Sequence, residues 1–125
     1  MKSEGFNQKI KVIIAEDQAL IRGALIALLN LEADIEVVGE AENGVEAGKL
    51  LDKCKADILL TDIEMPLMSG LELAQITVKK HPAIKTVIIT TFGRAGYIKR
   101  ALTTGVKGFL LKDTPSGELA AALRK

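Results

Sequence analysis

The sequence is poor in the residues that mark several common classes of protein. It has one cysteine, Cys54, so no internal disulfide can form, and a reducing compartment such as the cytoplasm is expected. Three Phe, one Tyr and no Trp are too few for a surface that stacks the bases of single-stranded nucleic acid. The formal net charge is only +1, which predicts no strong non-specific attraction to nucleic acid or anionic lipid. No apolar run approaches the roughly 20 residues of a membrane-spanning helix, so no membrane partner is expected.

Apolar residues, in contrast, are plentiful, at 48% of the 125 residues. This length suits one compact domain around one hydrophobic core, and disorder would need lower hydrophobicity and a higher net charge. Residues 1–9 are polar, and we expect them to form a flexible tail that precedes a single domain over residues 10–125.

Short apolar runs alternate with segments of helical periodicity along the whole domain. The runs are rich in β-branched residues without polar alternation, which is typical of strands buried on both faces of a parallel sheet. The predicted strands cover residues 11–15, 36–40, 58–61, 86–90 and 108–111. The predicted helices cover residues 19–31, 45–53, 71–80, 97–104 and 116–125.

Repeated strand–helix units indicate a three-layer α/β fold with right-handed connections. For five strands we adopt, by analogy, the flavodoxin-like (βα)5 arrangement with strand order 2-1-3-4-5. The first and fifth helices then cover one face of the sheet, and the other three cover the opposite face. The second run is the most polar, which predicts an edge strand.

Polar residues follow four of the predicted strands at the point where each strand ends. They are Glu16 and Asp17, Asp62, Thr90, and Lys112. The carboxyl ends of parallel strands share one edge of the sheet, where ligands bind near the switch in strand direction. Three carboxylates together repel one another unless a cation neutralises them, and hard oxygen ligands point to Mg²⁺ or Mn²⁺.

Asp62 lies centrally in this set and is the candidate nucleophile, since carboxylates form aspartyl phosphates. Lys112 and the Thr90 hydroxyl would then hold phosphoryl oxygens. Each residue also has a plain structural explanation, because acids favour helix starts and turns and Lys112 can be solvated beside Asp113. Polar residues at four of the five strand ends, taken together, favour a site.

Two other classes share parts of this pattern. A haloacid-dehalogenase-like phosphatase also uses an aspartyl nucleophile after a strand and needs an acid two residues later, where Glu64 stands. It further needs a later acidic metal pair, which the sequence does not show. A flavin-binding electron carrier needs a Ser, Thr or Gly phosphate loop after the first strand, and AEDQA has the opposite charge.

The motifs IIAED, TDIEMPLMSG, VIITT and GFLLKD together resemble the receiver domain of two-component response regulators, over nearly the whole chain. The GFLLKD ending resembles the NarL/LuxR-type subgroup, whose members carry a C-terminal helix-turn-helix domain. The resemblance implies a signalling domain, not an enzyme, that accepts a phosphoryl group from a sensor histidine kinase.

The resemblance also assigns roles to individual residues. It implies a phosphoacceptor (Asp62), metal ligands (Asp17, Asp62 and the backbone carbonyl of Glu64, with Glu16 reaching the metal through water), a phosphoryl-binding cation (Lys112), a switch hydroxyl (Thr90) and an aromatic that changes rotamer (Phe109). Phe109 can equally be an ordinary packed strand residue. We expect the charge of Glu64, at the mouth of the site, to affect the lifetime of the phosphoryl group.

The predicted first helix carries only two polar residues, Arg22 and Asn30, so it has more than a core face to cover. With the small apolar helix 116–125 beside it, we expect a symmetric dimer through both helices, promoted by phosphorylation. The alternative is a thick helix–sheet core without a dimer. Helical periodicity still runs at Lys125, so we expect a fragment of a longer transcriptional regulator whose DNA contacts lie in a further domain; a stand-alone receiver is the alternative.

Overall fold

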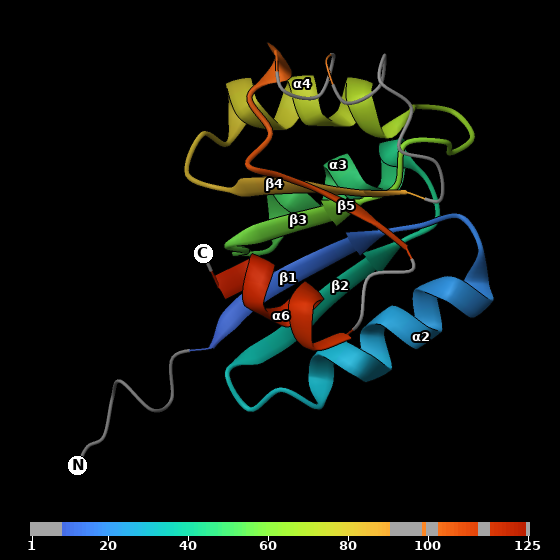
Figure 1. Cartoon of the computed structure of the whole chain (residues 1–125). Helices are drawn as coiled ribbons and strands as arrows, with labels where there is room; N and C mark the ends of the chain where they lie inside the picture. Colours follow the sequence, from blue (N-terminus) through green and yellow to red (C-terminus); the bar gives the residue numbers. More distant parts are fainter. Residues whose placement is uncertain (1–8, 91–98, 100–102, 113–115, 125) are drawn as a thin grey trace.

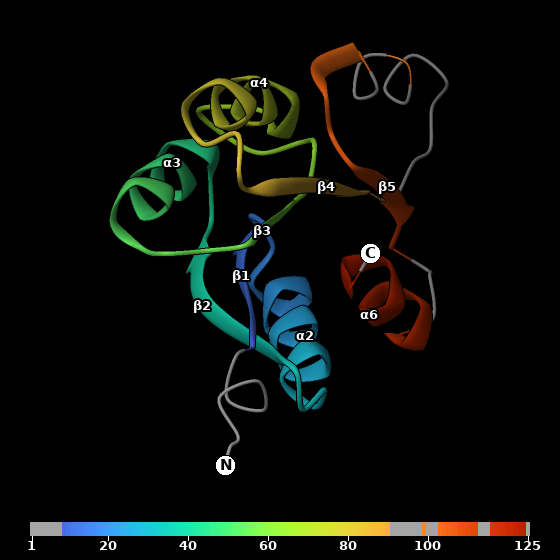
Figure 2. The ribbon, with the colours of Figure 1, turned by 90° about the vertical axis from the view of Figure 1, so that its left-hand side faces the viewer.

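In the computed structural model, which describes residues 9–90, 99, 103–112 and 116–124, five parallel strands form one sheet between two layers of helices (Figures 1 and 2). The strand order is β2-β1-β3-β4-β5, as the sequence analysis predicted, and β2 is an edge strand. The strands are β1 (Ile10–Ala15), β2 (Ile35–Ala41), β3 (Ile58–Thr61), β4 (Lys85–Thr90) and β5 (Gly108–Leu111).

The helices lie on the two faces of the sheet in the predicted way. The helices are α2 (Ala19–Asn30), α3 (Gly44–Lys53), α4 (Gly70–Lys80) and α6 (Ser116–Arg124). Figure 2 shows α2 and α6 on one face and α3 and α4 on the other. The predicted helix over 97–104 and the predicted tail over 1–9 fall largely outside the described residues, although 99, 103 and 104 are helical.

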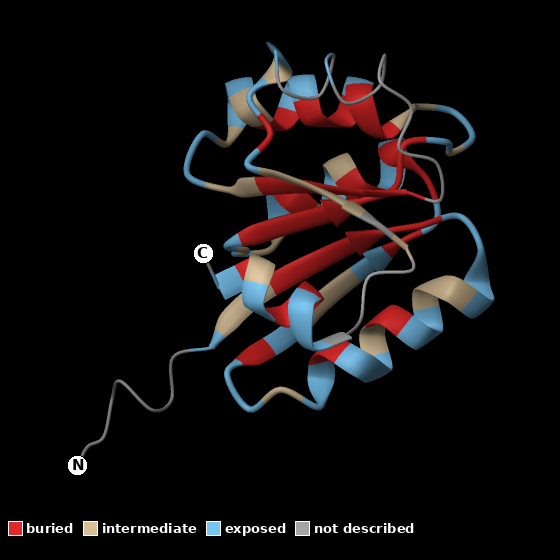
Figure 3. Ribbon diagram, in the orientation of Figure 1, coloured by how far each residue is buried: buried red, intermediate tan, exposed pale blue. Residues whose placement is uncertain are grey.

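Two apolar cores lie on the two faces of the sheet, and the central strands are buried (Figure 3). On one face, Leu25 and Leu29 of α2 and Leu123 of α6 pack against alternate residues of β1, β3 and β4. On the other face, Ala47 and Leu51 of α3 pack against the intervening residues of β1 and β3. Alternate strand residues therefore serve both layers, which explains the continuous apolar runs.

Local side-chain caps begin the helices that follow β2 and β3. The Asn43 side chain accepts a hydrogen bond from the Glu46 amide (2.8 Å) and caps α3. Ser69 and Glu72 form a reciprocal capping box at the start of α4. Gly105 has a φ of +101°, which suits glycine at the end of a helical segment. No helix in the described part of the chain is long and apolar enough to cross a membrane.

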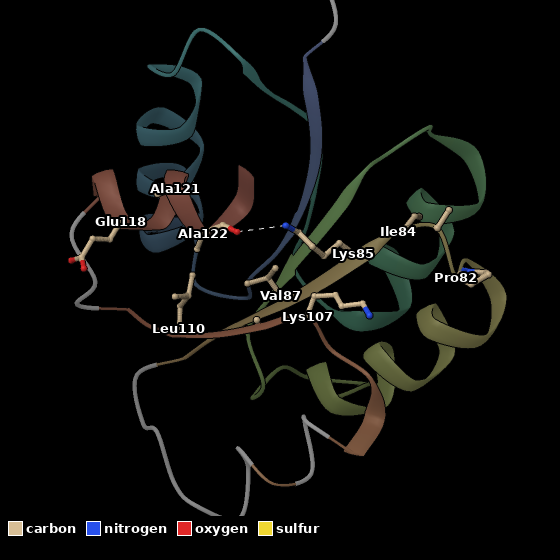
Figure 4. Close-up of a pocket in the computed structure, with 11 residues that line it drawn as sticks. Pro82, Ile84, Lys85, Val87, Lys107, Leu110, Glu118, Ala121 and Ala122 are labelled. Atoms are coloured by element: carbon tan, nitrogen blue, oxygen red, sulfur yellow. Dashed lines mark hydrogen bonds between the residues drawn. The ribbon is translucent and has the colours of Figure 1, made fainter. Parts of the chain in front are cut away.

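Two cations attach the C-terminal end of α6 to its neighbours. Lys85, at the start of β4, donates to the carbonyls of Leu123 (3.0 Å) and Ala122 (3.5 Å) (Figure 4). Arg124 pairs with Asp34 (2.7 Å) in the turn between α2 and β2. Positive charge beside the last carbonyls of a helix is favourable because those groups carry the negative end of the helix dipole.

Candidate functional site

The loop after β1 carries a fully buried carboxylate, Glu16. The Glu16 amide donates to the Ala41 carbonyl at the end of β2 (3.0 Å), and Glu16 Oε2 accepts from the Gln18 amide (3.0 Å). Asp17 follows on the exposed rim of the loop. The loop therefore places one carboxylate inside the site and one at its mouth.

Asp62 directly follows β3 and is only 7% exposed. Its amide donates to the Ala15 carbonyl of β1 (3.0 Å), and its Oδ1 accepts from the Ile63 amide (2.7 Å). Its carbonyl accepts from the Thr61 hydroxyl (2.9 Å). Both the backbone and the side chain of Asp62 are thus held in place, with Oδ2 directed toward Lys112.

The start of α4 approaches Asp62 so closely that only glycine fits there. The Gly70 amide donates to the Ile63 carbonyl (2.7 Å). A Cβ added to Gly70 would lie 1.7 Å from the Asp62 carbonyl oxygen, far inside contact distance. Any side chain at residue 70 would therefore displace α4 or the loop that carries Asp62.

Lys112, just past β5, joins these carboxylates. Its Nζ lies 2.7 Å from Glu16 Oε1 and 3.1 Å from Asp62 Oδ2. Its amide donates to the carbonyl of Thr90 at the end of β4 (2.8 Å). The site residues that follow β1, β3 and β5 thus meet at the carboxyl edge of the sheet.

The charges of this site shift one another's protonation. Burial raises the pKa of the Glu16 carboxyl, and the ion pair with Lys112 only partly offsets this effect. Burial by itself lowers the pKa of Lys112, but its ion pairs with Glu16 and Asp62 outweigh burial and raise that pKa. The Lys112 ammonium therefore stays charged and supplies positive charge beside Asp62.

The donor set fits a divalent cation. Carboxylate oxygens of Glu16, Asp17 and Asp62 lie within 4.8 Å of one another. Glu16 Oε1 is buried and accepts no well-oriented hydrogen bond from the described residues, so the Lys112 ion pair alone compensates it. Three ionised carboxylates and one ammonium leave an excess of negative charge, which a hard cation such as Mg²⁺ or Mn²⁺ would neutralise.

This geometry coincides with a family match over almost the whole chain. The family model of the response regulator receiver domain matches residues 12–124. The chain is a response regulator receiver domain. This family is a signalling domain rather than an enzyme or an electron carrier, so the match makes the phosphatase and flavin-carrier alternatives wrong.

Individual relatives place this receiver within the NarL/LuxR type of transcriptional regulator. The transcriptional regulatory protein DesR of Bacillus subtilis (strain 168) is 50% identical over 115 residues, 92% of this chain and 57% of DesR. A LuxR-family DNA-binding response regulator from Staphylococcus aureus has a TM-score of 0.88 at 38% identity, covering 92% of this chain and 96% of that one. The receiver domain of a NarL regulator from Mycobacterium tuberculosis has a TM-score of 0.89 at 30% identity, covering 94% of each chain. The receiver thus spans little more than half the length of DesR.

The remaining predicted residues surround the cluster in different ways. Thr90 ends β4 and is buried. Phe109 of β5 is half-buried and packs against a small apolar cluster that contains Ile63 and Leu71, next to Asp62 and Gly70. Glu64 is exposed in the loop between β3 and α4. All three therefore lie on the elements that carry the acidic cluster or adjoin it.

Sequence reasoning did not recognise the residues of α2 and β2 that support the acidic cluster. It treated Arg22 only as an exception in an apolar helix, although the Arg22 guanidinium contacts the Glu16 carbonyl. It assigned no role to Glu40, the ion-pair partner of Arg22. The sequence did carry a signal, because a single charged residue in the first turn of an otherwise apolar helix indicates an ion-pair partner nearby.

A separate cavity of about 630 Å³ lies between α6 and the starts of β4 and β5 (Figure 4). Lys85, Lys107 and Glu118 are its charged lining residues. Because the strands are parallel, their starts lie at the opposite edge of the sheet from Asp62 and Lys112. The cavity therefore has no part in the chemistry of the acidic cluster.

Proposed function

We propose that Asp62 accepts a phosphoryl group and that this modification switches the conformation of the receiver. The observation that carries the proposal is the position of Asp62 Oδ2, 3.1 Å from the Lys112 ammonium and within the cluster that Glu16 and Asp17 complete. This arrangement combines a nucleophilic carboxylate with groups able to neutralise a phosphoryl group.

Residues of the chain itself supply the nucleophile for phosphoryl transfer and bind the phosphoryl oxygens. The Ile63 amide holds Asp62 Oδ1, which leaves Oδ2 for attack on the phosphorus of the donor. As the new P–O bond forms, the P–N bond of a donor phosphohistidine breaks and the imidazole nitrogen keeps the electron pair. Lys112 neutralises one equatorial phosphoryl oxygen, and the Thr90 hydroxyl donates a hydrogen bond to another.

Mg²⁺ or Mn²⁺ would be held by Asp17, Asp62 and the backbone carbonyl of Glu64, with Glu16 acting through water. When bound, the cation neutralises the charge that accumulates on the phosphoryl oxygens. Burial of Glu16 suits a contact of this indirect kind, since Lys112 already occupies its Oε1 side. Asp17 at the exposed rim suits direct contact with a partly hydrated ion.

The conformational switch depends on how differently the inactive and active states of the receiver bind the phosphoryl group. A phosphoryl group on Asp62 favours the state in which Thr90 moves toward it, and a population shifts only by such differential binding. The space that Thr90 leaves allows Phe109 to turn inward. The surface formed by β5 and the neighbouring helical segment then changes.

We further propose a sensor histidine kinase as the phosphoryl donor, in the cytoplasm. Phosphorylation promotes a symmetric dimer through α2 and α6; Leu20 in the first turn of α2 (87% exposed) and Leu31 directly after its end (79% exposed) are apolar residues that such a dimer would cover. DNA contacts belong to a C-terminal domain of a longer regulator, in keeping with the greater length of DesR.

The decisive experiment is phosphorylation by acetyl phosphate with Mg²⁺, read out by intact-protein mass spectrometry. We expect the parent to gain one phosphoryl group and Asp62→Asn to gain none. Asp57→Asn, which alters a carboxylate at the opposite edge of the sheet, is the matched control and should be phosphorylated like the parent. Equal labelling of Asp62→Asn and the parent would overturn the assignment.

A further inference from the structure

Arg22 connects the acidic site to the edge strand of the sheet. It is the single charged residue of α2, and its side chain is only 15% exposed. Its Nη1 donates to the backbone carbonyl of Glu16 (2.7 Å). Its Nε pairs with Oε1 of Glu40 on β2 (2.9 Å). One guanidinium thus bridges the loop after β1 and the end of β2.

The Glu16 carbonyl is the contact that matters here, because every other polar atom of Glu16 is already held. Its amide, Oε2 and Oε1 face Ala41, Gln18 and Lys112, as described above. Glu16 is fully buried, so water does not readily replace a lost partner of its carbonyl. That carbonyl belongs to the peptide bond that joins Glu16 to Asp17. Its orientation therefore sets the relative positions of the two carboxylates.

We propose that Arg22 is a positioning residue for the divalent cation and that Glu40 orients Arg22. The inference rests on the proposed function, in which Glu16, Asp17 and Asp62 hold that cation. Arg22 contacts neither the cation nor the phosphoryl group. It acts by fixing the Glu16–Asp17 peptide, and Glu40 fixes the plane of its guanidinium.

Whether cation binding becomes weaker or tighter when Arg22 is removed distinguishes the positioning role from a purely electrostatic effect of its charge. Removing a positive charge near a cation site strengthens cation binding if charge is all that matters. Removing a group that fixes the ligands weakens binding, although the net charge becomes more favourable. Arg22→Ala therefore gives opposite results under the two explanations.

The first measurement is Mn²⁺ binding to the 125-residue chain, followed by the loss of the electron paramagnetic resonance signal of free Mn²⁺. We expect Arg22→Ala to weaken binding about tenfold, and Arg22→Gln, which is neutral but keeps a donor, to weaken it less. Glu40→Gln should weaken binding about twofold to threefold, and should add nothing further in the presence of Arg22→Ala. Arg124→Ala removes another ion-paired arginine, outside the site, and should bind Mn²⁺ like the parent.

The second measurement is the Mg²⁺ dependence of phosphorylation by acetyl phosphate. In Arg22→Ala the Mg²⁺ concentration for half-maximal rate should rise about tenfold, while the rate at saturating Mg²⁺ stays near that of the parent. A general loss of structure would lower the saturating rate instead. If thermal unfolding shows that Arg22→Ala does not fold, Mn²⁺ binding by Arg22→Gln takes its place. Weaker binding than in the parent supports the positioning role, and unchanged or tighter binding overturns it.

Unchanged or tighter Mn²⁺ binding in a folded Arg22 variant overturns the positioning role while the proposed function stands. A parent chain that binds no Mn²⁺ and takes up no phosphoryl group overturns the proposed function, and this inference with it. Weaker binding in Arg124→Ala, equal to that in Arg22→Ala, also overturns the positioning role, because the effect would then come from stability alone.

Discussion

Glu16 shows at the scale of one residue what a buried carboxylate requires. Burial of an unpaired charge is strongly unfavourable, and the raised pKa of Glu16 expresses this cost. The fold compensates with the Lys112 ammonium at 2.7 Å and the Gln18 amide at 3.0 Å. A divalent cation beside Glu16 would reduce the cost further, which ties cation binding to the stability of the site.

Leu67 carries local backbone strain in the loop between β3 and α4. Its φ is 70°, a left-handed conformation that is unfavourable for leucine, and its side chain is 80% exposed. We expect Leu67→Gly to stabilise the protein by about 0.5–1 kcal/mol, because the relieved strain exceeds the added chain entropy. Urea unfolding measures this change.

Leu31→Gly is the matched control for Leu67→Gly. Leu31 is 79% exposed but has a φ of −71°, so glycine relieves no strain there. We expect it to destabilise the protein by about 0.5–1 kcal/mol. Changes of the same sign in both variants would contradict the strain at Leu67.

Glu64 belongs to the mouth of the site, two residues past Asp62, and its side chain is exposed. We expect its charge to repel or orient the water that attacks the phosphoryl group. We expect Glu64→Gln to change the dephosphorylation rate severalfold, measured by the loss of the phosphorylated mass after removal of acetyl phosphate. Glu36→Gln, also exposed but near the start of β2, is the control for lost charge; equal rates in Glu64→Gln and the parent would contradict the role.

At the scale of elements, α4 is fixed at its N-terminus by its cap and by contact with the site. The Ser69–Glu72 capping box begins α4, and Gly70 places it against the Asp62 carbonyl. A movement of Asp62 is therefore transmitted directly to the start of α4. This contact makes α4 a rigid neighbour of the proposed phosphorylation site.

The attachment of α6 to the turn after α2 gives a pH dependence. Hydrogen bonding to Arg124 lowers the pKa of Asp34. Since the folded-state pKa lies below the unfolded value, the ion pair stabilises the protein at neutral pH and this contribution is lost as pH falls through the folded pKa. Asp34→Asn should therefore be less stable than the parent at pH 7, and the difference should shrink as the pH falls below 3.8, the ordinary pKa of an aspartate, and through the lowered folded-state pKa.

Urea unfolding of both proteins at several pH values measures this difference. Glu42→Gln is the control, because Glu42 is exposed and forms no ion pair among the described residues. Its difference from the parent should be small at every pH. If the stability difference between the parent and Asp34→Asn grows as the pH falls, the ion pair does not contribute to stability in the way that the lowered pKa of Asp34 predicts.

At the scale of the whole molecule, the proposed dimer uses the face that α2 and α6 share. Leu28 of α2 is 40% exposed, as is Ile76 of α4 on the opposite face. With a phosphoryl mimic such as beryllofluoride, Leu28→Asp should remain a monomer in sedimentation velocity, because a charge is introduced into an apolar interface. Ile76→Asp should dimerise like the parent.

A parent chain that is monomeric with and without beryllofluoride would contradict the dimer. If Ile76→Asp also loses dimerisation, the interface does not follow α2 and α6. Each variant should keep its Mn²⁺ affinity, since neither residue belongs to the acidic cluster.

The sequence alone predicted the strands and the residues of the acidic edge because these depend on short-range signals, whereas the strand order was adopted by analogy with other five-stranded parallel sheets. Apolar runs such as 58–61 indicate burial on both faces, and four of the five runs end in a polar residue or are followed directly by one. The predicted starts of α3 and α4, at residues 45 and 71, were each one residue late, because Asn43 and Ser69 cap helices that begin at Gly44 and Gly70. The region between 91 and 102 gave no comparable test, because most of it lies outside the described residues.

The pattern of apolar and polar residues along the sequence therefore determined which strands and helices form. It also determined which edge of the sheet carries Asp62 and Lys112. Only the tertiary structure decided how those side chains compensate one another: the burial of Glu16, the contact between Gly70 and Asp62, and the support from Arg22. Each of these depends on distances between segments that come together only when the sheet and its helices pack. Periodicity within one segment indicates which face of that segment is buried, but it carries no information about such distances.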